Sequence, residues 1–463
     1  MSTPLDDVQR IVLCGSRWQE ARHLVLSFGA SRAPLHFLHQ LEAHCWPARA
    51  GDAKPEVQAS LGFSRRGLEH AQVPRHVLAQ FALKSPAFYA GAALRAHRYL
   101  GVSGRNGPGA WQPAFGFTTL DAVLSLHGMD GSLLDQRVAC IRTLANACDV
   151  QVQELLPASR LQPPPGETAD PLATWVHFGY RDGLSQVGIQ GWQPPERLTA
   201  TKPVSPYAAG EFVLGHPQGS GSNPWIAGPG TRVWPEQLRS FFHNGSFGVL
   251  NQVEQDAEAF EQFVGAKPLE LGPRELKGKL CGRYTDGYPL GATQDAPDND
   301  FDYAKDEEGY GCPFGAHARR MNPRGGALPD ATRPRPLLRR GMPYGAPLWG
   351  EGSPSAEKRG LIGQFFCASI EDQFEHLVGQ WADRVPLGSA DRGGARDPLV
   401  GAHEPGDGAF EIPQGAGKPP LLLEGLRPFT RTAGVAYLFY PSLQVLEKIV
   451  QAQFWRVPAE DAR

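Results

Sequence analysis

The chain has 463 residues, of which 41% are hydrophobic and 20% are charged, the composition of a globular protein with a substantial core. Its 45 basic and 48 acidic residues leave a formal net charge of -3, so the charge predicts neither a nucleic-acid partner nor binding to an anionic membrane. The sequence contains no apolar run of the roughly 18 residues that span a membrane, no secretory signal at its start and no CxxC motif among its 7 cysteines. A cytoplasmic protein is the expectation.

The first half of the chain is predicted to run strand, helix, strand, and then strand, helix, strand again. The strands are expected at 23–28, 59–63, 122–126 and 150–155. A helix over 33–45 follows the first strand, and a second helix carries an apolar face from Leu134 to Ala145 at a spacing of three or four residues. A helical, partly polar stretch from Arg65 to about Leu100 separates the two units as an insertion.

The second half repeats this order in part. Strands are expected at 246–254, 364–368 and 436–440. A helix over 257–265 follows the first of them, and a second helix is predicted from Ile370 to Trp381 with the apolar spacing of the helix in the first half. Ser369 and Asp372 form a plausible capping box at the start of that second helix.

This symmetry predicts an α+β fold of two ferredoxin-like βαββαβ units with antiparallel sheets, of the dimeric α+β barrel type. Residues 1–205 are expected to form an N-terminal domain and residues 206–463 a C-terminal domain. The second strand of the C-terminal unit is not evident. A segment from about 270 to 360, rich in Gly, Pro, Arg and Asp, interrupts this unit, and so long an insertion in a compact domain is typical of a functional site.

Within this segment, GCPFGAHARRMNPR at 311–324 predicts a short helix around His317. Pro313 suits the first turn of the helix and Asn322–Pro323 would end it, which places His317 in mid-helix. The small residues directly before the histidine would let a flat macrocycle approach the backbone. The alternative is a surface histidine on a short helix with solvated arginines.

Two further segments carry charged residues beside glycines. In HFGYRDGLSQ, Gly179 and Gly183 bracket Asp182, and because glycine readily adopts positive φ, they can hold the carboxylate on a sharp loop that faces a cavity. In LLRRGMPYG, Arg339 and Arg340 precede a glycine. The alternatives are an ordinary Asp-Gly turn and a loop with solvated arginines.

Taken together, these segments resemble the signature of the dye-decolourising peroxidase family, with GYRDG, AHARRMNPR and LRRGMPYG in this order. Other stretches agree with the same family, among them HNGSFGVLNQVEQD at 243–256, RDPLVG at 396–401 and AYLFYPSL at 436–443, so the resemblance spans nearly the whole chain. It implies a duplicated ferredoxin-like fold that binds non-covalent haem b in its C-terminal half.

The resemblance also implies an enzyme, a haem peroxidase that reduces hydrogen peroxide and oxidises organic substrates such as dyes or phenols by one-electron steps. The partners it implies are hydrogen peroxide and a small aromatic reductant, with no nucleic acid and no membrane, and a homo-oligomer remains open. The alternative is a haem-binding carrier, or a specialised biosynthetic haem oxidase with little general peroxidase activity.

The resemblance assigns a role to each candidate residue. His317 matches the axial iron ligand, and Asp397 in RDPLVG matches the carboxylate that accepts the imidazole N–H, with an Asp-Pro turn as the alternative. Asp182 matches the acid–base residue of the distal side, where peroxide binds. Arg339 matches the distal arginine, and Arg340 is the neighbour with which it can be confused.

Two further expectations concern the walls of the haem pocket. Arg320, together with Arg319 and Arg324, is expected to meet the haem propionates. The distal strand of the family usually reads GLLF, whereas this chain has LIGQ at 361–364. A large apolar side chain over the distal face of the haem is therefore predicted to be missing.

Overall fold

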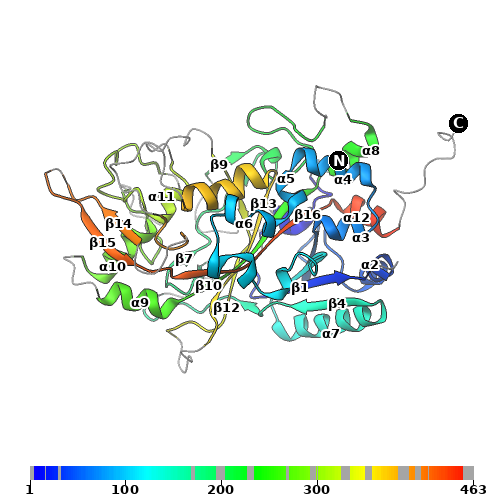
Figure 1. The fold of residues 1–463 in the computed structure, drawn as a ribbon, viewed down its shortest axis with the longest axis horizontal. Coiled ribbons are helices and arrows are strands. Elements are labelled where there is room, and N and C mark those ends of the chain that lie inside the picture. Colours follow the sequence, from blue (N-terminus) through cyan, green and yellow to red (C-terminus); the bar gives the residue numbers. More distant parts are fainter. Residues whose placement is uncertain are drawn as a thin grey trace.

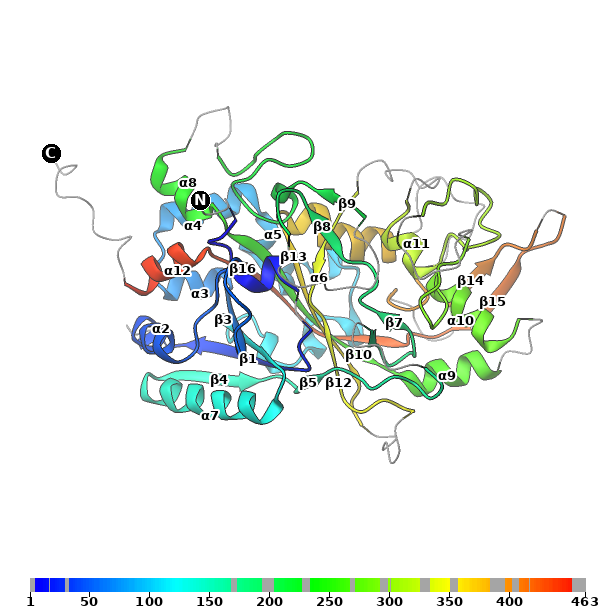
Figure 2. The same cartoon turned by 180° about the vertical axis from the view of Figure 1, so that it is seen from behind.

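The structure, a computed structural model, describes the following parts of the chain: 5–15, 17–29, 33–167, 173–193, 204–226, 234–266, 271–291, 299, 301–324, 334–349, 357–383, 396–401, 408–415 and 417–451. The molecule is elongated, and the helices and sheet of the N-terminal unit lie at one end (Figures 1 and 2). The hairpin of β14 (Gly408–Ile412) and β15 (Leu421–Leu426) projects at the other end.

The first half folds as one βαββαβ unit, which confirms the prediction. Its strands are β1 (Glu20–Phe28), β2 (Val57–Phe63), β3 (Ala122–Gly128) and β4 (Val150–Glu154). Its helices are α2 (Ala33–His44) and α7 (Gly131–Ala147), and the insertion forms α3 (Arg65–His70), α4 (Arg75–Lys84), α5 (Pro86–Ala90) and α6 (Ala92–Tyr99). β1 lies between β3 and β4, and β3 also pairs with β2, all antiparallel.

The second half repeats this unit with one broken strand. It contains β10 (Ser246–Gln255), α9 (Ala257–Ala266), β13 (Gly360–Cys367), two π-helical segments (Ile370–Glu375 and Leu377–Ala382) and β16 (Thr430–Tyr440). The strand that the sequence does not reveal consists of β11 (Leu338–Arg339) and β12 (Met342–Tyr344), which both pair with β13. Gly341 divides these two pieces, so neither is long enough to show an alternating pattern.

The remaining elements connect and cover the two units. They are α1 (Arg10–Leu13), β5 (Ala158–Ser159), β6 (Thr174–Trp175), β7 (Arg181–Asp182), β8 (Val187–Ile189), β9 (Val204–Tyr207), α8 (Glu236–Phe242), α10 (Pro273–Cys281), α11 (His317–Met321) and α12 (Leu443–Val450). Short 3-10 helices lie at Gly104–Asn106, Pro108–Ala110, Pro113–Phe115 and Ala209–Glu211.

The strands of both units join into one closed sheet. The 10-stranded sheet runs from β10 through β16, β2, β3, β1, β5 and β12 to β13, and β13 pairs in turn with β10. The sheet is therefore a barrel to which both units contribute, as in the predicted α+β barrel type. The predicted division of the chain into domains at residue 205 stays a prediction.

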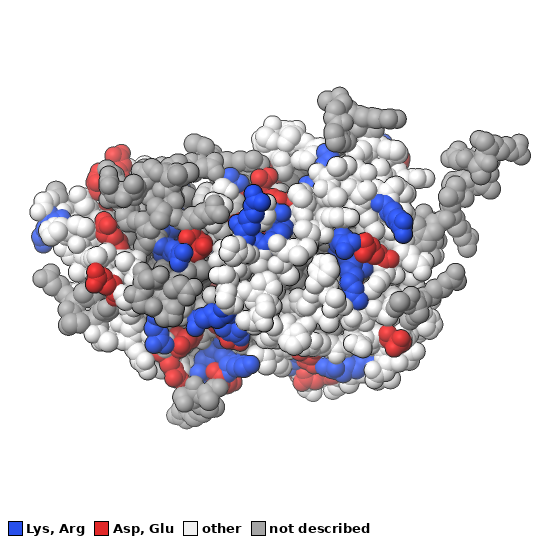
Figure 3. Space-filling view, in the orientation of Figure 1, with Lys and Arg blue, Asp and Glu red and all other residues white. Residues whose placement is uncertain are grey.

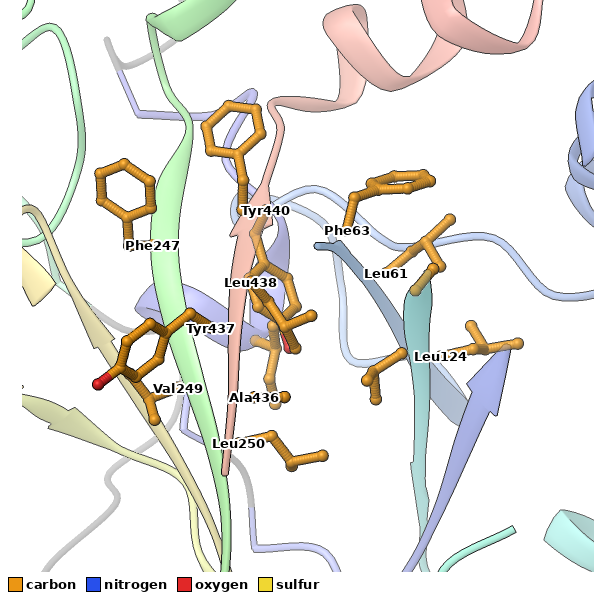
Figure 4. Close-up of a cluster of buried hydrophobic side chains, with 14 of the residues drawn as sticks. Leu61, Phe63, Leu124, Phe247, Val249, Leu250, Ala436, Tyr437, Leu438 and Tyr440 are labelled. Atoms are coloured by element: carbon orange, nitrogen blue, oxygen red, sulfur yellow. The ribbon is translucent and has the colours of Figure 1, made fainter. Parts of the chain in front are cut away.

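The largest hydrophobic core follows this barrel through both halves of the chain. Side chains alternate across its strands: Leu250 and Leu438 point to one side of β10 and β16, and Val249 and Tyr437 point to the other (Figure 4). A second core cluster lies outside the barrel, between α9, α10 and the β14–β15 hairpin. This second core supports the region that carries the candidate site.

The interior of the barrel is partly polar. Gln364 of β13 donates a hydrogen bond from Nε2 to Ser125 Oγ of β3, over 3.0 Å. β13 and β3 are not neighbours in the sheet, so this bond crosses the barrel. Ser125 Oγ also lies 2.8 Å from Nδ1 of His23, and the ring of His127 is 5.7 Å from that of His23.

The fold is expected to lose stability when the pH falls below about 6.5. Burial lowers the pKa of His23 to about 3 and the pKa values of His127 and His177 to about 4, so all three are neutral in the folded chain. In the unfolded chain a histidine takes up its proton near a pKa of ~6.5. Between that pH and the folded pKa values the unfolded state binds more protons, so stability decreases, by several kcal/mol in total at about 1.4 kcal/mol for each pKa unit.

The melting temperature, measured from roughly pH 7 to pH 4, checks this prediction. We expect a steep decrease in the wild type and a shallower one in His127→Gln, which removes one buried titrating group. His39→Gln is the control, because His39 is exposed and its replacement should leave the slope unchanged. A melting temperature that stays constant over this range would contradict the prediction.

On the face shown in Figure 3, basic and acidic side chains are interspersed, without a large patch of one sign. Among the described residues, none of the helices combines the length and the apolar character needed to cross a membrane.

Candidate active site

The site lies at the end of the molecule that carries α11 and β7 (Figures 1 and 2). His317 is the first residue of α11, so the prediction that it lies in mid-helix was wrong. Pro313 does not begin the helix, because Ala316 has the extended backbone of an N-cap residue, with φ -59° and ψ 137°. The helix ends before Asn322, as predicted. His317 therefore stands at a partly exposed helix end instead of on a helix face.

A buried carboxylate, that of Asp397, orients the imidazole of His317 through its Nδ1 atom. Nδ1 of His317 lies 2.7 Å from Oδ2 of Asp397, which is fully buried. The other carboxylate oxygen accepts hydrogen bonds from the backbone N–H groups of Leu399 (2.9 Å) and Val400 (3.1 Å). These bonds fix the carboxylate, so the imidazole has one orientation and presents Nε2 to the space in front of it.

The pKa of the histidine reflects this pairing. Burial alone would lower the pKa of His317, but the Asp397 carboxylate outweighs burial and raises it above the ordinary value. Arg339 lowers and Asp182 raises the pKa of His317 by weaker Coulombic effects. Burial likewise raises the pKa of Asp397, but His317 and the backbone N–H of Leu399 lower it below its ordinary value. The charges of Asp182 and Arg339 therefore reach His317 from outside the pair.

Asp182 lies on a tight hairpin, as its glycines predict. Gly179 and Gly183 have φ values of 79° and 74°, a region that favours glycine. Asp182 lies on the short strand β7, opposite Thr174 of β6. His177 of the same segment points away from this loop: it is buried, and its Nε2 lies 2.9 Å from the carbonyl oxygen of Tyr344.

The structure separates the two neighbouring arginines. Arg339 is exposed and donates a hydrogen bond from Nη2 to the carbonyl oxygen of Ser185, over 3.1 Å, in the loop that follows Asp182. Arg340 turns the other way, and its Nε and Nη2 bind the carbonyl oxygens of Ile11 (3.0 Å) and Val12 (2.9 Å). Of the two arginines, only Arg339 therefore points toward the loop that follows Asp182.

The strand segment expected to line the distal face of the haem carries an aromatic ring beside a glycine. A side chain is indeed missing at Gly363, but a Cβ atom placed there would lie 2.5 Å from the ring of Phe365. The Phe365 ring thus covers the glycine, on the face of β13 that Arg339 shares, since these two residues are opposite each other in the sheet. Gln364 points into the barrel and not toward the site. The prediction that a large apolar side chain is missing over the distal face of the haem stays a prediction.

The arginines that follow His317 are mostly buried. Arg319 forms an ion pair with Asp306 (2.8 Å) between the rings of Tyr303 and Phe314. Arg320 donates a hydrogen bond from Nη1 to the carbonyl oxygen of Trp381, over 2.6 Å. The bonds of Arg319 and Arg320 attach α11 to the surrounding loops and to the segment that contains Trp381. Asp306 was not predicted from the sequence, because no local pattern pairs it with an arginine 13 residues away.

The residues fit a haem, the group that the resemblance implies. His317 presents Nε2 on a side chain that is 31% exposed, while Nδ1 is taken by Asp397. Within the described parts of the chain, neither Asp182 nor Arg339 forms an ion pair, so both charges are available to a ligand. In the same parts, no cluster of three or more metal-ligating side chains is present. A single imidazole ligand with an acid and a base nearby suits iron that a macrocycle already holds.

Comparison with known proteins extends this interpretation. No family model matches the chain. The chain is 28% identical over 392 residues to the dye-decolorizing peroxidase of Mycena epipterygia, which covers 74% of this chain and 69% of that protein. It is 27% identical over an alignment of 494 residues to the multifunctional dye peroxidase DyP2 of an Amycolatopsis species, which covers 97% of this chain and 96% of that protein.

Solved structures show the same fold. A fungal DyP-type peroxidase from Auricularia auricula-judae matches with a TM-score of 0.74 and 22% identity, over 97% of this chain and 100% of that one. A DyP-type peroxidase from Anabaena matches with a TM-score of 0.73 and 20% identity, over 96% of this chain and 94% of that one. The fold, the ordered motifs and the relatives agree, and the chain is similar over most of its length to dye-decolourising peroxidases.

Proposed function

We propose that the protein is a haem peroxidase that reduces hydrogen peroxide and oxidises small aromatic donors, such as dyes or phenols, by one-electron steps. The observation that carries this proposal is the bond of 2.7 Å between His317 Nδ1 and the buried Asp397, with the charges of Asp182 and Arg339 acting on the same imidazole. Such an arrangement suits an iron ligand that faces an acid–base pair.

The cofactor proposed is haem b, held without covalent bonds. His317 Nε2 would bind the iron, and bound haem would give two electrons to peroxide and regain them one at a time from the aromatic donor. The Asp397 carboxylate keeps the Nδ1–H of the imidazole oriented and makes Nε2 a stronger donor, which favours the higher oxidation states of iron. The contact of Arg320 with a haem propionate stays a prediction.

Asp182 and Arg339 have different roles in the reaction with peroxide: Asp182 transfers a proton, and Arg339 stabilises negative charge. The Asp182 carboxylate accepts the proton of one peroxide oxygen and returns it to the other oxygen, which leaves as water. The Arg339 guanidinium stabilises the negative charge that develops on the leaving oxygen. The hydrogen bond from Arg339 to the Ser185 carbonyl keeps this cation beside the Asp182 loop. The Phe365 ring, opposite Arg339 in the sheet, supplies an apolar wall beside the guanidinium.

A reconstitution experiment tests the function. The purified protein, supplied with haem, is expected to show a Soret band that changes on addition of hydrogen peroxide, followed by turnover of a phenol or dye that depends on peroxide. A haem carrier would show the Soret band without this turnover. Such a result would replace the peroxidase proposal by the carrier alternative.

Replacing Arg339 by leucine is expected to slow the reaction with peroxide about 10²-fold or more, the usual cost of removing a donor from a developing negative charge. The control is Arg340→Leu, which removes the hydrogen bonds to Ile11 and Val12. This variant should have a lower melting temperature but nearly the wild-type rate of reaction with peroxide. Stopped-flow measurement of the Soret change gives both rates. A slower reaction in Arg340→Leu than in Arg339→Leu would reverse the assignment.

A further inference from the structure

The polar interior of the barrel contains side chains without a visible partner. Ser60 of β2, His127 of β3 and Gln364 of β13 are 0%, 4% and 2% exposed. Ser60 Oγ, His127 Nδ1 and Gln364 Oε1 have no hydrogen-bond partner among the residues that the structure describes. The proposed peroxidase mechanism uses none of these atoms.

Ser60 and Gln364 both lie beside Ser125, and His127 lies two residues farther along the strand of Ser125. Ser60 is the register partner of Ser125 on the neighbouring strand, and Gln364 binds Ser125 Oγ with the nitrogen of the same amide group. His127 occupies the next inward position of β3 after Ser125, and its ring stands edge-on to His23 at 5.7 Å. The groups therefore line two successive levels of the interior, and the three atoms do not bond to one another.

Without bound water, these buried polar groups would lower the stability of the fold. A buried polar atom without a partner costs about 1–3 kcal/mol relative to water, and folded proteins satisfy nearly all such atoms with protein groups or with bound water. A buried water molecule typically makes about three hydrogen bonds to polar groups that lack other partners. The barrel interior provides such groups from three different strands.

We propose that the interior of the barrel is a binding site for ordered water molecules, held by Ser60 and His127 of the N-terminal unit and Gln364 of the C-terminal unit. The chemistry of the groups is complementary, because the Ser60 hydroxyl can donate, the Gln364 carbonyl oxygen can only accept, and a neutral imidazole nitrogen can do either. Water that bonds to these groups would link the two units from within, in addition to the Gln364–Ser125 bond.

The replacement Ser60→Ala distinguishes a hydrated interior from a dry one. If water satisfies the hydroxyl, its removal takes away a bonded group, and the melting temperature should decrease by roughly 1–3 °C. If the hydroxyl is unsatisfied, its removal relieves a penalty, and the melting temperature should increase. The substitution is small enough that the full chain should still fold.

Ser246→Ala is the matched control. Ser246 is also fully buried on a barrel strand, but its hydroxyl donates directly to the carbonyl oxygen of Phe212 over 2.8 Å. Its replacement should lower the melting temperature whether the barrel interior is hydrated or dry. The size of this decrease gives the effect of removing one buried hydroxyl that has a hydrogen-bond partner. An unchanged or increased melting temperature in Ser60→Ala, beside a decrease in Ser246→Ala, would overturn the proposal.

A crystal structure at a resolution that shows ordered water gives a direct second measurement. Water density is expected within hydrogen-bond distance of Ser60 Oγ, His127 Nδ1 and Gln364 Oε1 in the wild type, and density beside residue 60 should disappear in Ser60→Ala. An interior without such density, or one in which the three side chains bond to each other directly, would also overturn the proposal.

Discussion

Replacing His317 by alanine is expected to abolish stable haem binding and with it the Soret band of the ferric protein. The reason is geometric: the imidazole is held from behind by the buried Asp397, and its Nε2 has no substitute on a five-residue helix that contains one histidine. The other histidines near the site are committed elsewhere, as His177 is buried against the Tyr344 carbonyl. Titration of the variant with haem, followed by absorption, checks this result.

The control for this experiment is His243→Ala, which removes an exposed histidine far from the site in the sequence. It should bind haem as the wild type does. Circular dichroism of the His317→Ala protein without haem should match that of the wild type, since the residue lies at a partly exposed helix end. A variant that retains haem with an unchanged spectrum would show that His317 is not the ligand.

Replacing Asp182 by asparagine is expected to slow the reaction with peroxide by about 10²- to 10⁴-fold, the usual contribution of a positioned general base. Asparagine keeps the shape and the hydrogen-bonding capacity of the side chain but cannot accept the proton. The glycines on both sides, at φ values of 79° and 74°, should preserve the loop in the variant. Asp182→Glu retains a carboxylate and should recover part of the rate.

The pH profile of the wild type gives an independent measurement. A carboxylate base stays ionised in mild acid, where a histidine base would be protonated, so activity should peak at roughly pH 4–5. The buried histidines His23 and His127 limit this range on the acid side, because their protonation accompanies unfolding. Melting curves recorded at each pH separate the two effects.

An optimum near neutrality, with a folded protein throughout, would remove Asp182 from the proposed mechanism. The same conclusion would follow if Asp182→Asn reacted with peroxide as fast as the wild type. In either case Arg339, with water as the proton carrier, would have to perform the cleavage of the O–O bond. The dye used must have its own pKa outside the range of the measurement.

Much of the fold can be predicted from local pattern, because it depends on residues that are neighbours in the chain. The apolar spacing from Leu134 to Ala145 predicts α7, and the capping pair at Ser369 and Asp372 marks a helix start that the structure confirms, with a bond of 3.1 Å from the Asp372 N–H to Ser369 Oγ. The turn at Asp182 follows from glycine itself, since few other residues adopt its backbone conformation readily.

Other features depend on residues that meet only after folding. His317 and Asp397 are separated by 80 positions, so their bond is a property of the tertiary structure and not of either segment. The strand formed by β11 and β12 has no pattern of its own and exists because β13 offers it hydrogen bonds. Arg339 and Arg340 are equivalent by local composition, and only pairing with β13 turns one toward Asp182 and the other toward Val12.

The sequence by itself indicated the resemblance to dye-decolourising peroxidases, the two repeated units and the candidate site residues, because motifs and periodicities are local properties of the chain. The tertiary structure alone decided the closed barrel, the place of the Phe365 ring over Gly363 and the polar layer around Ser125. The physical reason is the same in each case. Contacts between strands that are distant in the chain form when burial brings them together, and no local sequence pattern records which side chains will then face each other.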